Sequence, residues 1–145
     1  MPGVIRFRVR GLPATEGSKV GRIVHTRERG DVAVVVDVNQ RSLADWRRSI
    51  GTACSFVYQG TPLEGPVGVK LSFYFLRPKT QTRRQREQSW LPNGKDLDKL
   101  ERAVFDAVKM IAWRDDRQVA FVTATKRYAD DEHLPGLEAE IWSLE

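Results

Sequence analysis

The spacing of the apolar residues changes period along this chain, and this restricts the folds that it can form. Apolar and polar residues alternate over residues 4–10 and 67–75, which is typical of half-buried strands. Over residues 42–57, and from residue 97 to about residue 110 or 112, apolar side chains recur every three or four positions, as in amphipathic helices. Further strands are predicted at 22–25, 32–38, 119–128 and 137–144.

This order of elements predicts a single α/β domain in which a mixed sheet packs against two main helices. The strands at 22–25 and 32–38 are close enough in sequence to form a hairpin across residues 27–31. Ser42 is the predicted N-cap of the first helix, and Gly60 lies just past its end. A chain of 145 residues is long enough to bury a core without a disulfide or a metal ion.

The composition is that of an ordinary globular protein, with 41% hydrophobic and 30% charged residues. The longest apolar stretches, residues 32–36 and 104–113, are far shorter than the roughly 20 residues of a membrane-spanning helix, and no signal pattern precedes them. The single cysteine, Cys54, cannot form an intramolecular disulfide, and together with His25 and His133 it is too small a set for a zinc site. We therefore expect a protein of the cytoplasm that makes no contact with a membrane.

Most of the excess positive charge lies in one short segment. The chain has 24 Lys and Arg against 19 Asp and Glu, a net charge of +5. Residues 77–90 hold five of the bases and one acid, so they supply +4 of that total, and they show no apolar periodicity. With the turn-forming residues 90–94, they predict a flexible basic loop over residues 77–94. Such a loop either neutralises DNA phosphates or is a solvated surface loop without a ligand.

Two aspartates, Asp96 and Asp98, stand where this loop meets the second helix. Inside a helix, side chains two residues apart diverge, so these carboxylates converge only if Asp96 is extended or capping and Asp98 opens the first turn. In the alternative interpretation, Asp96 is only an N-cap and Asp98 only interacts with the helix dipole. Asp98 and Arg102 are four residues apart and therefore share the polar face of the helix.

A third acid, Asp116, follows the second helix. If the next strand folds back beside this helix, Asp116 can approach Asp96 and Asp98. Three carboxylates close together repel one another unless a cation neutralises them, and a ligand set of oxygens alone selects Mg²⁺ or Mn²⁺. A hard divalent ion beside a basic loop is suited to phosphodiester hydrolysis, because the ion activates water and offsets charge on the phosphate.

A series of short motifs follows in order from residue 95. They are Lys95-Asp96-Leu97-Asp98-Lys99-Leu100, Arg102-Ala103, Phe105-Asp106-Ala107, Trp113-Arg114-Asp115-Asp116-Arg117-Gln118-Val119 and Lys126-Arg127-Tyr128. Their order and separations resemble the RusA family of Holliday junction resolvases over residues 95–140. That family's pattern is D-[LV]-D-N-L, a basic residue four after the second aspartate, a D-A-L step and an aromatic-x-D-D-x-Q-[VI] turn.

The resemblance implies one RusA-like nuclease domain over residues 1–145, acting in DNA recombination and repair. The expected enzyme is a homodimeric, Mg²⁺-dependent endodeoxyribonuclease, also active with Mn²⁺, that cuts two opposed strands of a four-way junction. By position, the family's catalytic and metal-binding acids fall on Asp96, Asp98 and Asp116. Arg102 holds the place of the catalytic lysine, and it keeps the charge but cannot donate a proton, because an arginine side chain stays protonated in proteins. Lys99 replaces the family's usual asparagine.

Other residues of this region receive smaller roles. We interpret Asp115 as a turn residue or an outer support of the site, Asp106 as a structural partner for a base, and Trp90 as either a surface aromatic or a ring that stacks on a splayed base. The basic residues of the loop and of the motifs are predicted to bind DNA. They are Lys79, Arg83, Arg84, Arg86, Lys95, Lys99, Lys126 and Arg127.

Two other functions remain compatible with these residues. In one, the chain binds branched DNA without cutting it, and the acids are caps and turns. In the other, it is a metal-dependent nuclease for flaps or other branched DNA. A symmetric homodimer is expected for the junction-resolving enzyme because a four-way junction needs two nicks related by a two-fold axis. The family is often carried by phages and prophages, so a viral source would fit the resemblance.

Overall fold

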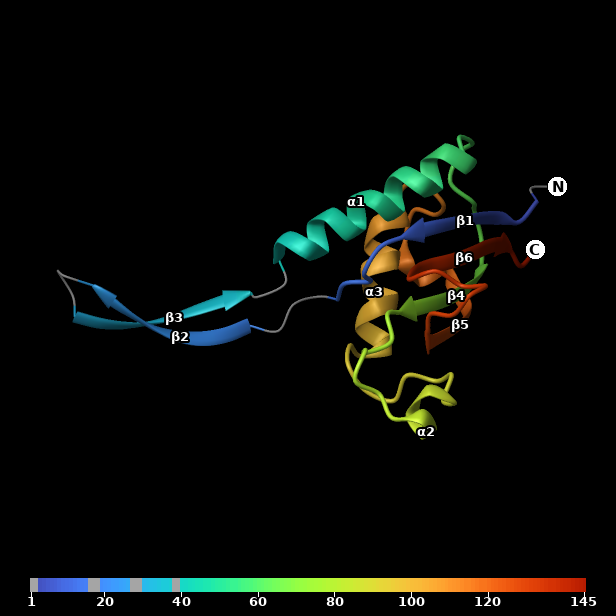
Figure 1. Ribbon diagram of the computed structural model, residues 1–145. Helices are drawn as coiled ribbons and strands as arrows, with labels where there is room; N and C mark the ends of the chain where they lie inside the picture. The colour runs from blue at the N-terminus through green and yellow to red at the C-terminus, as the bar shows by residue number, and fades with distance from the viewer. Residues whose placement is uncertain (1–2, 16–18, 27–29, 38–39) are drawn as a thin grey trace.

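The computed structural model describes the backbone of residues 3–15, 19–26, 30–37 and 40–145, and the side chains of residues 3–15 and 42–145. Its elements follow the predicted order, with one short helix added in the basic segment (Figure 1). They are β1 (Ile5–Arg10), β2 (Lys19–Thr26), β3 (Gly30–Asp37), α1 (Gln40–Val57), β4 (Val67–Phe75), α2 (Arg83–Arg86), α3 (Leu97–Val108), the 3-10 turn η1 (Asp116–Gln118), β5 (Val119–Tyr128) and β6 (Gly136–Ser143).

Four of the strands form a mixed sheet in the order β1-β6-β4-β5. Strand β6 pairs antiparallel with both β1 and β4, whereas β4 and β5 are parallel. A parallel pair needs a crossover connection, and α3 lies in the connection between these two strands. The predicted α/β class, with a mixed sheet and two main helices, is therefore confirmed.

The two long helices pack on one face of this sheet. Strand β1 shows the alternation directly, because Ile5, Phe7 and Val9 are buried and its three arginines are exposed. The same core takes in Ile50 of α1 and the apolar stripe of α3. That stripe consists of Leu100, Ala103, Val104 and Val108. In the described part of the chain, no helix has the length and apolar character needed to cross a membrane.

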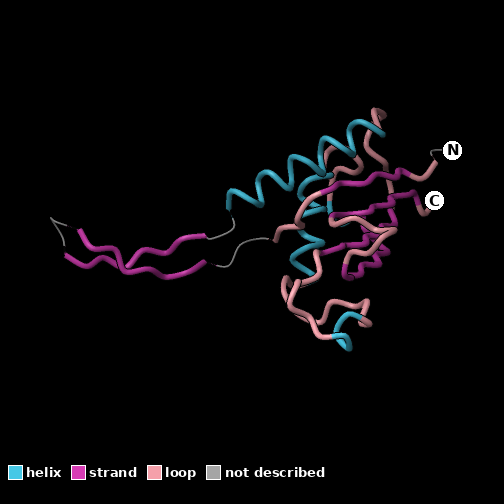
Figure 2. The backbone as a smooth tube through the Cα atoms, in the orientation of Figure 1, coloured by secondary structure: helices cyan, strands magenta, loops and turns pink. Residues whose placement is uncertain are grey.

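Strands β2 and β3 form a separate two-stranded sheet. They pair antiparallel from Lys19 opposite Asp37 to Thr26 opposite Gly30, so the predicted hairpin is confirmed and its strands are longer than expected. The hairpin extends away from the four-stranded sheet (Figures 1 and 2). Residues 27–29 of the predicted turn lie outside the described residues.

The ends of both long helices differ from the prediction. Helix α1 begins at Gln40, so Ser42 lies inside the helix and is not its N-cap. The polar residues before Leu43 show no apolar periodicity, yet glutamine and arginine are good helix formers. Helix α3 ends at Val108, earlier than expected, because Met110 takes a left-handed φ of 70° and the chain turns to bury Trp113.

Candidate active site

Asp96 and Asp98 lie where α3 begins, next to the segment that contains α2 (Figure 1). Asp96 is the N-cap residue with an extended backbone (φ −67°, ψ 134°), and Asp98 is in the first turn of the helix. This is the junction that the spacing of the two acids predicted. Because α3 crosses over between parallel strands, its first turn lies at the edge of the sheet where β4 and β5 end.

The carboxylate of Asp96 does not cap the helix. It accepts no capping hydrogen bond, although its residue occupies the N-cap position. Its Oδ2 atom forms an ion pair with Nζ of Lys99 at 3.7 Å, and 66% of its side chain is exposed. A carboxylate that served as a cap would accept a bond from a backbone N–H of the first turn. Asp96 therefore occupies the N-cap position, but its carboxylate pairs with Lys99 instead of capping the helix.

Lys126 of β5 holds the backbone that leads to Asp96. Its ammonium donates hydrogen bonds to the carbonyl oxygens of Asn93 and Lys95, both at 2.9 Å. The sequence placed Lys126 among the DNA-binding residues because it is basic and lies in a family motif. In the structure its ammonium group is hydrogen-bonded within the protein, and these bonds link β5 to the turn before α3.

Two further charged residues of α3 follow Asp98. The pKa of Glu101, three residues on, is raised first by partial burial and then by the negative charge of Asp98. Arg102, four residues on, is exposed on the same helix, where its guanidinium can offset negative charge at Asp98. The family motifs point to Arg102 but not to Glu101, although the three-residue spacing of Glu101 from Asp98 is a sequence signal for their interaction.

Asp116 lies away from the acid pair, beyond the C-terminal end of α3. Its Oδ1 atom accepts a hydrogen bond from Nε1 of Trp113 at 2.9 Å, and that indole packs edge-on against Phe105. Phe105 is seven residues after Asp98, a rise of about 10 Å along a helix. Among the described residues, no three Asp, Glu, His or Cys side chains are grouped so that they could hold a metal ion. The expected approach of Asp116 to Asp96 and Asp98 therefore does not occur within the single chain.

Asp115 and Asp106 have the structural roles predicted for them. Asp115 caps the 3-10 turn, where its carboxylate accepts hydrogen bonds from the backbone N–H of Arg117 at 2.8 Å and from its guanidinium at 3.0 Å. The side-chain bond to Arg117 is the main reason that the pKa of Asp115 is lowered. Asp106 of α3 pairs with Arg47 of α1 at 3.0 Å, which joins the two long helices.

The basic segment contains more regular structure than the sequence analysis predicted. Its α2 turn begins with a capping box, in which Thr82 and Gln85 exchange side-chain and backbone hydrogen bonds. Arg77 donates to two backbone carbonyl oxygens of the segment, both at 3.0 Å, and its guanidinium lies 4.4 Å from the centre of the Tyr128 ring. The predicted basic loop therefore includes a short helical turn, and the Thr-x-x-Gln pattern was its sequence signal.

Trp90 and Arg127 attach the end of this segment to β5. Backbone hydrogen bonds join the N–H of Leu91 to the carbonyl of Lys126 at 3.2 Å, and the N–H of Tyr128 to the carbonyl of Ser89 at 2.9 Å. The guanidinium of Arg127 lies 4.1 Å from the centre of the Trp90 ring. The Trp90 side chain is still 50% exposed, so the contact orients the ring without covering it.

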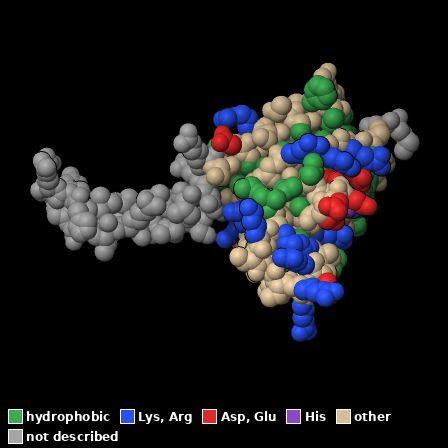
Figure 3. Space-filling model, viewed as in Figure 1, with side chains coloured by type: hydrophobic (Ala, Val, Ile, Leu, Met, Phe, Trp, Pro, Cys, Tyr) green, Lys and Arg blue, Asp and Glu red, His purple; other side chains and the backbone are tan. Residues whose placement is uncertain are grey.

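The predicted DNA-binding residues differ in their exposure. Figure 3 shows Lys and Arg side chains gathered at the lower end of the visible face, where α2 lies. The α2 segment therefore presents a cationic surface. The exposed members are Lys79, Arg83, Arg84 and Arg86, and the partly buried members are Lys95, Lys99, Lys126 and Arg127.

A comparison with models of protein families matches residues 21–141 to the family described as endodeoxyribonuclease RusA. The chain belongs to the RusA family. A search of curated proteins found no match. The RusA match begins in β2 and ends in β6, so it covers the acid pair, Asp116 and the basic segment and extends well beyond the motifs at residues 95–140. Membership identifies the chain as an endodeoxyribonuclease of the kind that resolves Holliday junctions, with branched DNA as its substrate.

The bond between Asp116 and Trp113 leads to a prediction about stability. Asp116→Asn keeps an oxygen that accepts this bond, whereas Asp116→Ala leaves the N–H of a fully buried indole without it. Losing such a partner costs about 1–3 kcal/mol. Urea unfolding should show a loss of that size in the free energy of unfolding for the alanine variant and a much smaller loss for the asparagine variant. Equal losses in the two variants would contradict this account of the bond.

Proposed function

We propose that this RusA-family chain is a Mg²⁺-dependent endonuclease that resolves four-way DNA junctions by paired, symmetric phosphodiester cuts. The observation that carries the proposal is the carboxylate of Asp96, which stands at a helix N-terminus without capping it. Asp98 follows in the first turn, and the α2 segment that precedes both acids in the chain carries exposed arginines. The exposed carboxylate of Asp96 is therefore accessible to an external ligand.

The chemistry of the acid pair fits a hard divalent ion. Asp96 and Asp98 offer carboxylate oxygens alone, the donor type that Mg²⁺ and Mn²⁺ prefer. Mg²⁺ is commonly held by one or two protein carboxylates together with water and substrate phosphates, so a pair of acids is a sufficient start for a site. Asp116 is the third proposed ligand. When bound, the ion would activate water and offset the charge on the phosphate under attack.

The basic residues of the chain have three different proposed roles. Arg102 is the proposed catalytic cation, and it stabilises the charge of the transition state without transferring a proton, because arginine stays protonated. Lys126 positions Asp96 through its bonds to the backbone just before the helix. The exposed cations of the α2 segment bind DNA phosphates and hold the substrate against the acid pair.

The position of Asp116 bears on the dimer that paired cuts require. Two nicks related by a two-fold axis need two acid sites in fixed relation, which an isologous homodimer supplies. The Trp113 bond holds Asp116 toward the C-terminal half of α3, away from the acid pair of its own chain. The proposed site therefore combines Asp96 and Asp98 of one copy with Asp116 of the second copy.

Cleavage of synthetic DNA tests the function. The protein should cut a four-way junction in the presence of Mg²⁺ and leave it intact in EDTA, with a matched duplex and a flap as comparison substrates. Asp96→Asn and Asp98→Asn should abolish cutting and retain junction binding in a gel-shift assay, because each removes a ligand and one negative charge near the phosphates. Arg102→Lys should keep much of the rate that Arg102→Ala loses.

Two outcomes would change the assignment. Near wild-type cutting by either asparagine variant would remove that aspartate from the site. Preferred cutting of the flap would make the chain a nuclease for other branched DNA rather than a junction resolvase.

Mixed dimers test whether two copies build each site. Differently tagged Asp98→Asn and Asp116→Asn subunits form a heterodimer in which one composite site keeps all of its acids. We expect this heterodimer to nick one junction strand, although each parent protein is inactive. A heterodimer of wild type with the double variant carries a change in both composite sites and should be inactive. The reverse pattern would show that the acids act within one chain.

Salt titration tests the basic segment. Replacing Arg83, Arg84 and Arg86 with glutamine leaves the capping box of α2 intact but removes three exposed charges. Binding to every DNA shape should weaken, and the slope of log K against log salt should become less steep by about 0.9 for each phosphate that the variant no longer neutralises. The exposed Arg48 of α1 provides the control, Arg48→Gln. An unchanged slope in the triple variant would favour a solvated segment without a ligand.

A further inference from the structure

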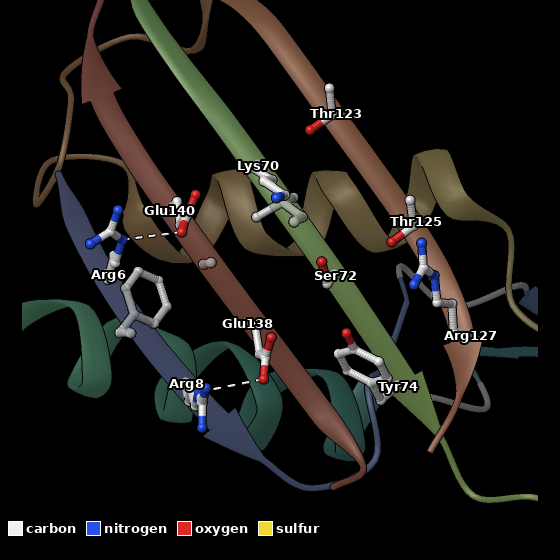
Figure 4. Close-up of a pocket in the computed structure, with 13 residues that line it drawn as sticks. Arg6, Arg8, Lys70, Ser72, Tyr74, Thr123, Thr125, Arg127, Glu138 and Glu140 are labelled. Atoms are coloured by element: carbon white, nitrogen blue, oxygen red, sulfur yellow. Dashed lines mark hydrogen bonds and ion pairs between the residues drawn. The ribbon is translucent and has the colours of Figure 1, made fainter. Parts of the chain in front are cut away.

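Within the described part of the chain, one face of the four-stranded sheet has no helix packed against it. Figure 4 views this face, with α1 and α3 behind the sheet and polar side chains projecting from all four strands toward the viewer. We call it the open face. It contains a hollow of about 590 Å³. Side chains that reach it include Arg6, Arg8, Lys70, Ser72, Thr125 and Arg127.

Charge is distributed unevenly across the open face. On the β1 and β6 side, Glu140 pairs with Arg6 at 3.1 Å and Glu138 pairs with Arg8 at 3.4 Å, so each carboxylate has a cation. The β4 and β5 side presents cations and hydroxyl groups. Three cross-strand pairs make up this strip: Lys70 with Thr123, Ser72 with Thr125, and Tyr74 with Arg127. Ammonium, guanidinium and hydroxyl groups are the usual donors to DNA phosphates.

Aromatic rings stand at both ends of this strip. At one end, Phe121 is 48% exposed, and its ring centre lies 6.0 Å from that of Trp142. A Cβ atom on Gly68 would lie 2.5 Å from the Trp142 ring, so the indole rests directly against the strand at this glycine. At the other end, the half-exposed ring of Trp90 lies against Arg127.

We propose that the open face binds single-stranded DNA, with bases stacked on Phe121 and Trp90 and phosphates held by Lys70 and Arg127. Aromatic rings stack only on bases whose faces are accessible, so a strand with unpaired bases fits this surface better than a duplex does. A second copy of the chain fits it less well, because the interior of a dimer interface is depleted of charged residues and this face is rich in them.

The open face meets the proposed active site only at the end of the sheet where β4 and β5 finish, because α3 and its acid pair lie behind the sheet. Arg127 ends the strip, and the neighbouring Lys126 holds the carbonyls of Asn93 and Lys95 just before Asp96. Because successive residues of a strand point to opposite faces, Arg127 projects onto the open face and Lys126 toward the α3 side. A strand that lies along β4 and β5 would therefore reach the acid pair by passing around this end of the sheet. This inference rests on the proposed nuclease function, since a branched substrate whose base pairs open at the branch point presents such a strand.

Fluorescence anisotropy with a dye-labelled oligo-dT of about 15 nucleotides, in EDTA so that no cleavage occurs, tests the proposal; that length matches common site sizes. The open-face variant is Phe121→Ala with Lys70→Gln, both exposed positions. Its matched control is Phe56→Ala with Arg48→Gln, on exposed positions of α1. We expect the open-face variant to bind about tenfold or more weakly and the control to bind like wild type, since stacking is worth about 1–3 kcal/mol per base.

Three results would overturn the proposal. They are an unchanged affinity of the open-face variant, an equal loss in the control, and a loss of dimer mass by light scattering, which would assign the face to a second copy. Circular dichroism and thermal unfolding verify that both variants are folded.

The failure of the inference can be told apart from the failure of the proposed function. If the wild-type chain binds oligo-dT through this face but cuts no junction in Mg²⁺, the nuclease assignment is refuted. The proposed DNA-binding role of the open face is then retained. If the wild-type chain cuts junctions and the open-face variant binds oligo-dT like wild type, the proposed DNA-binding role of the open face is refuted. The nuclease assignment is then unaffected.

Discussion

The parallel pairing of β4 with β5 is the constraint on which the rest of the molecule depends. Parallel neighbours cannot be joined by a tight turn, so the chain must cross the face of the sheet, and α3 makes that crossing with its apolar stripe buried. The crossing starts at the end of the sheet where both strands finish and carries the chain back to the end where both begin. It therefore places the N-terminus of α3, with Asp96 and Asp98, beside the basic segment and the last residues of β5.

Electrostatics at this helix terminus make an acidic pair tolerable before any ion binds. The positive end of the helix dipole favours the carboxylates, and Lys99 lies within 3.7 Å of Asp96. The raised pKa of Glu101 shows the limit of this compensation, because part of the shift comes from the charge of Asp98. The first turn of α3 thus concentrates negative charge that a hard cation would neutralise. The exposed arginines of the preceding α2 segment would attract the DNA phosphates.

Much of the site follows from local rules, and the exceptions have a common cause. The extended Asp96, the first-turn position of Asp98 and the structural roles of Asp106 and Asp115 all follow from spacing within a few residues. The contacts of Lys126 with the turn before Asp96 join residues more than thirty apart, and no local pattern specifies them. The location of Asp116 depends on how the buried indole of Trp113 packs after α3 ends, which is a property of the core.

The sequence by itself determined the order of the elements, the helical stripe of α3 and the two strands beside it, because apolar periodicity reports directly which side of each element is buried. It also determined the acid pair at a loop-to-helix junction, because in a helix interior the two side chains would diverge. Only the tertiary structure decided which face of the sheet stays open and that Arg127 meets Trp90. It also decided that Asp116 lies apart from the acids of its own chain. These depend on strand pairing and side-chain packing between distant segments, and such long-range contacts are set by the whole core rather than by any one stretch of residues.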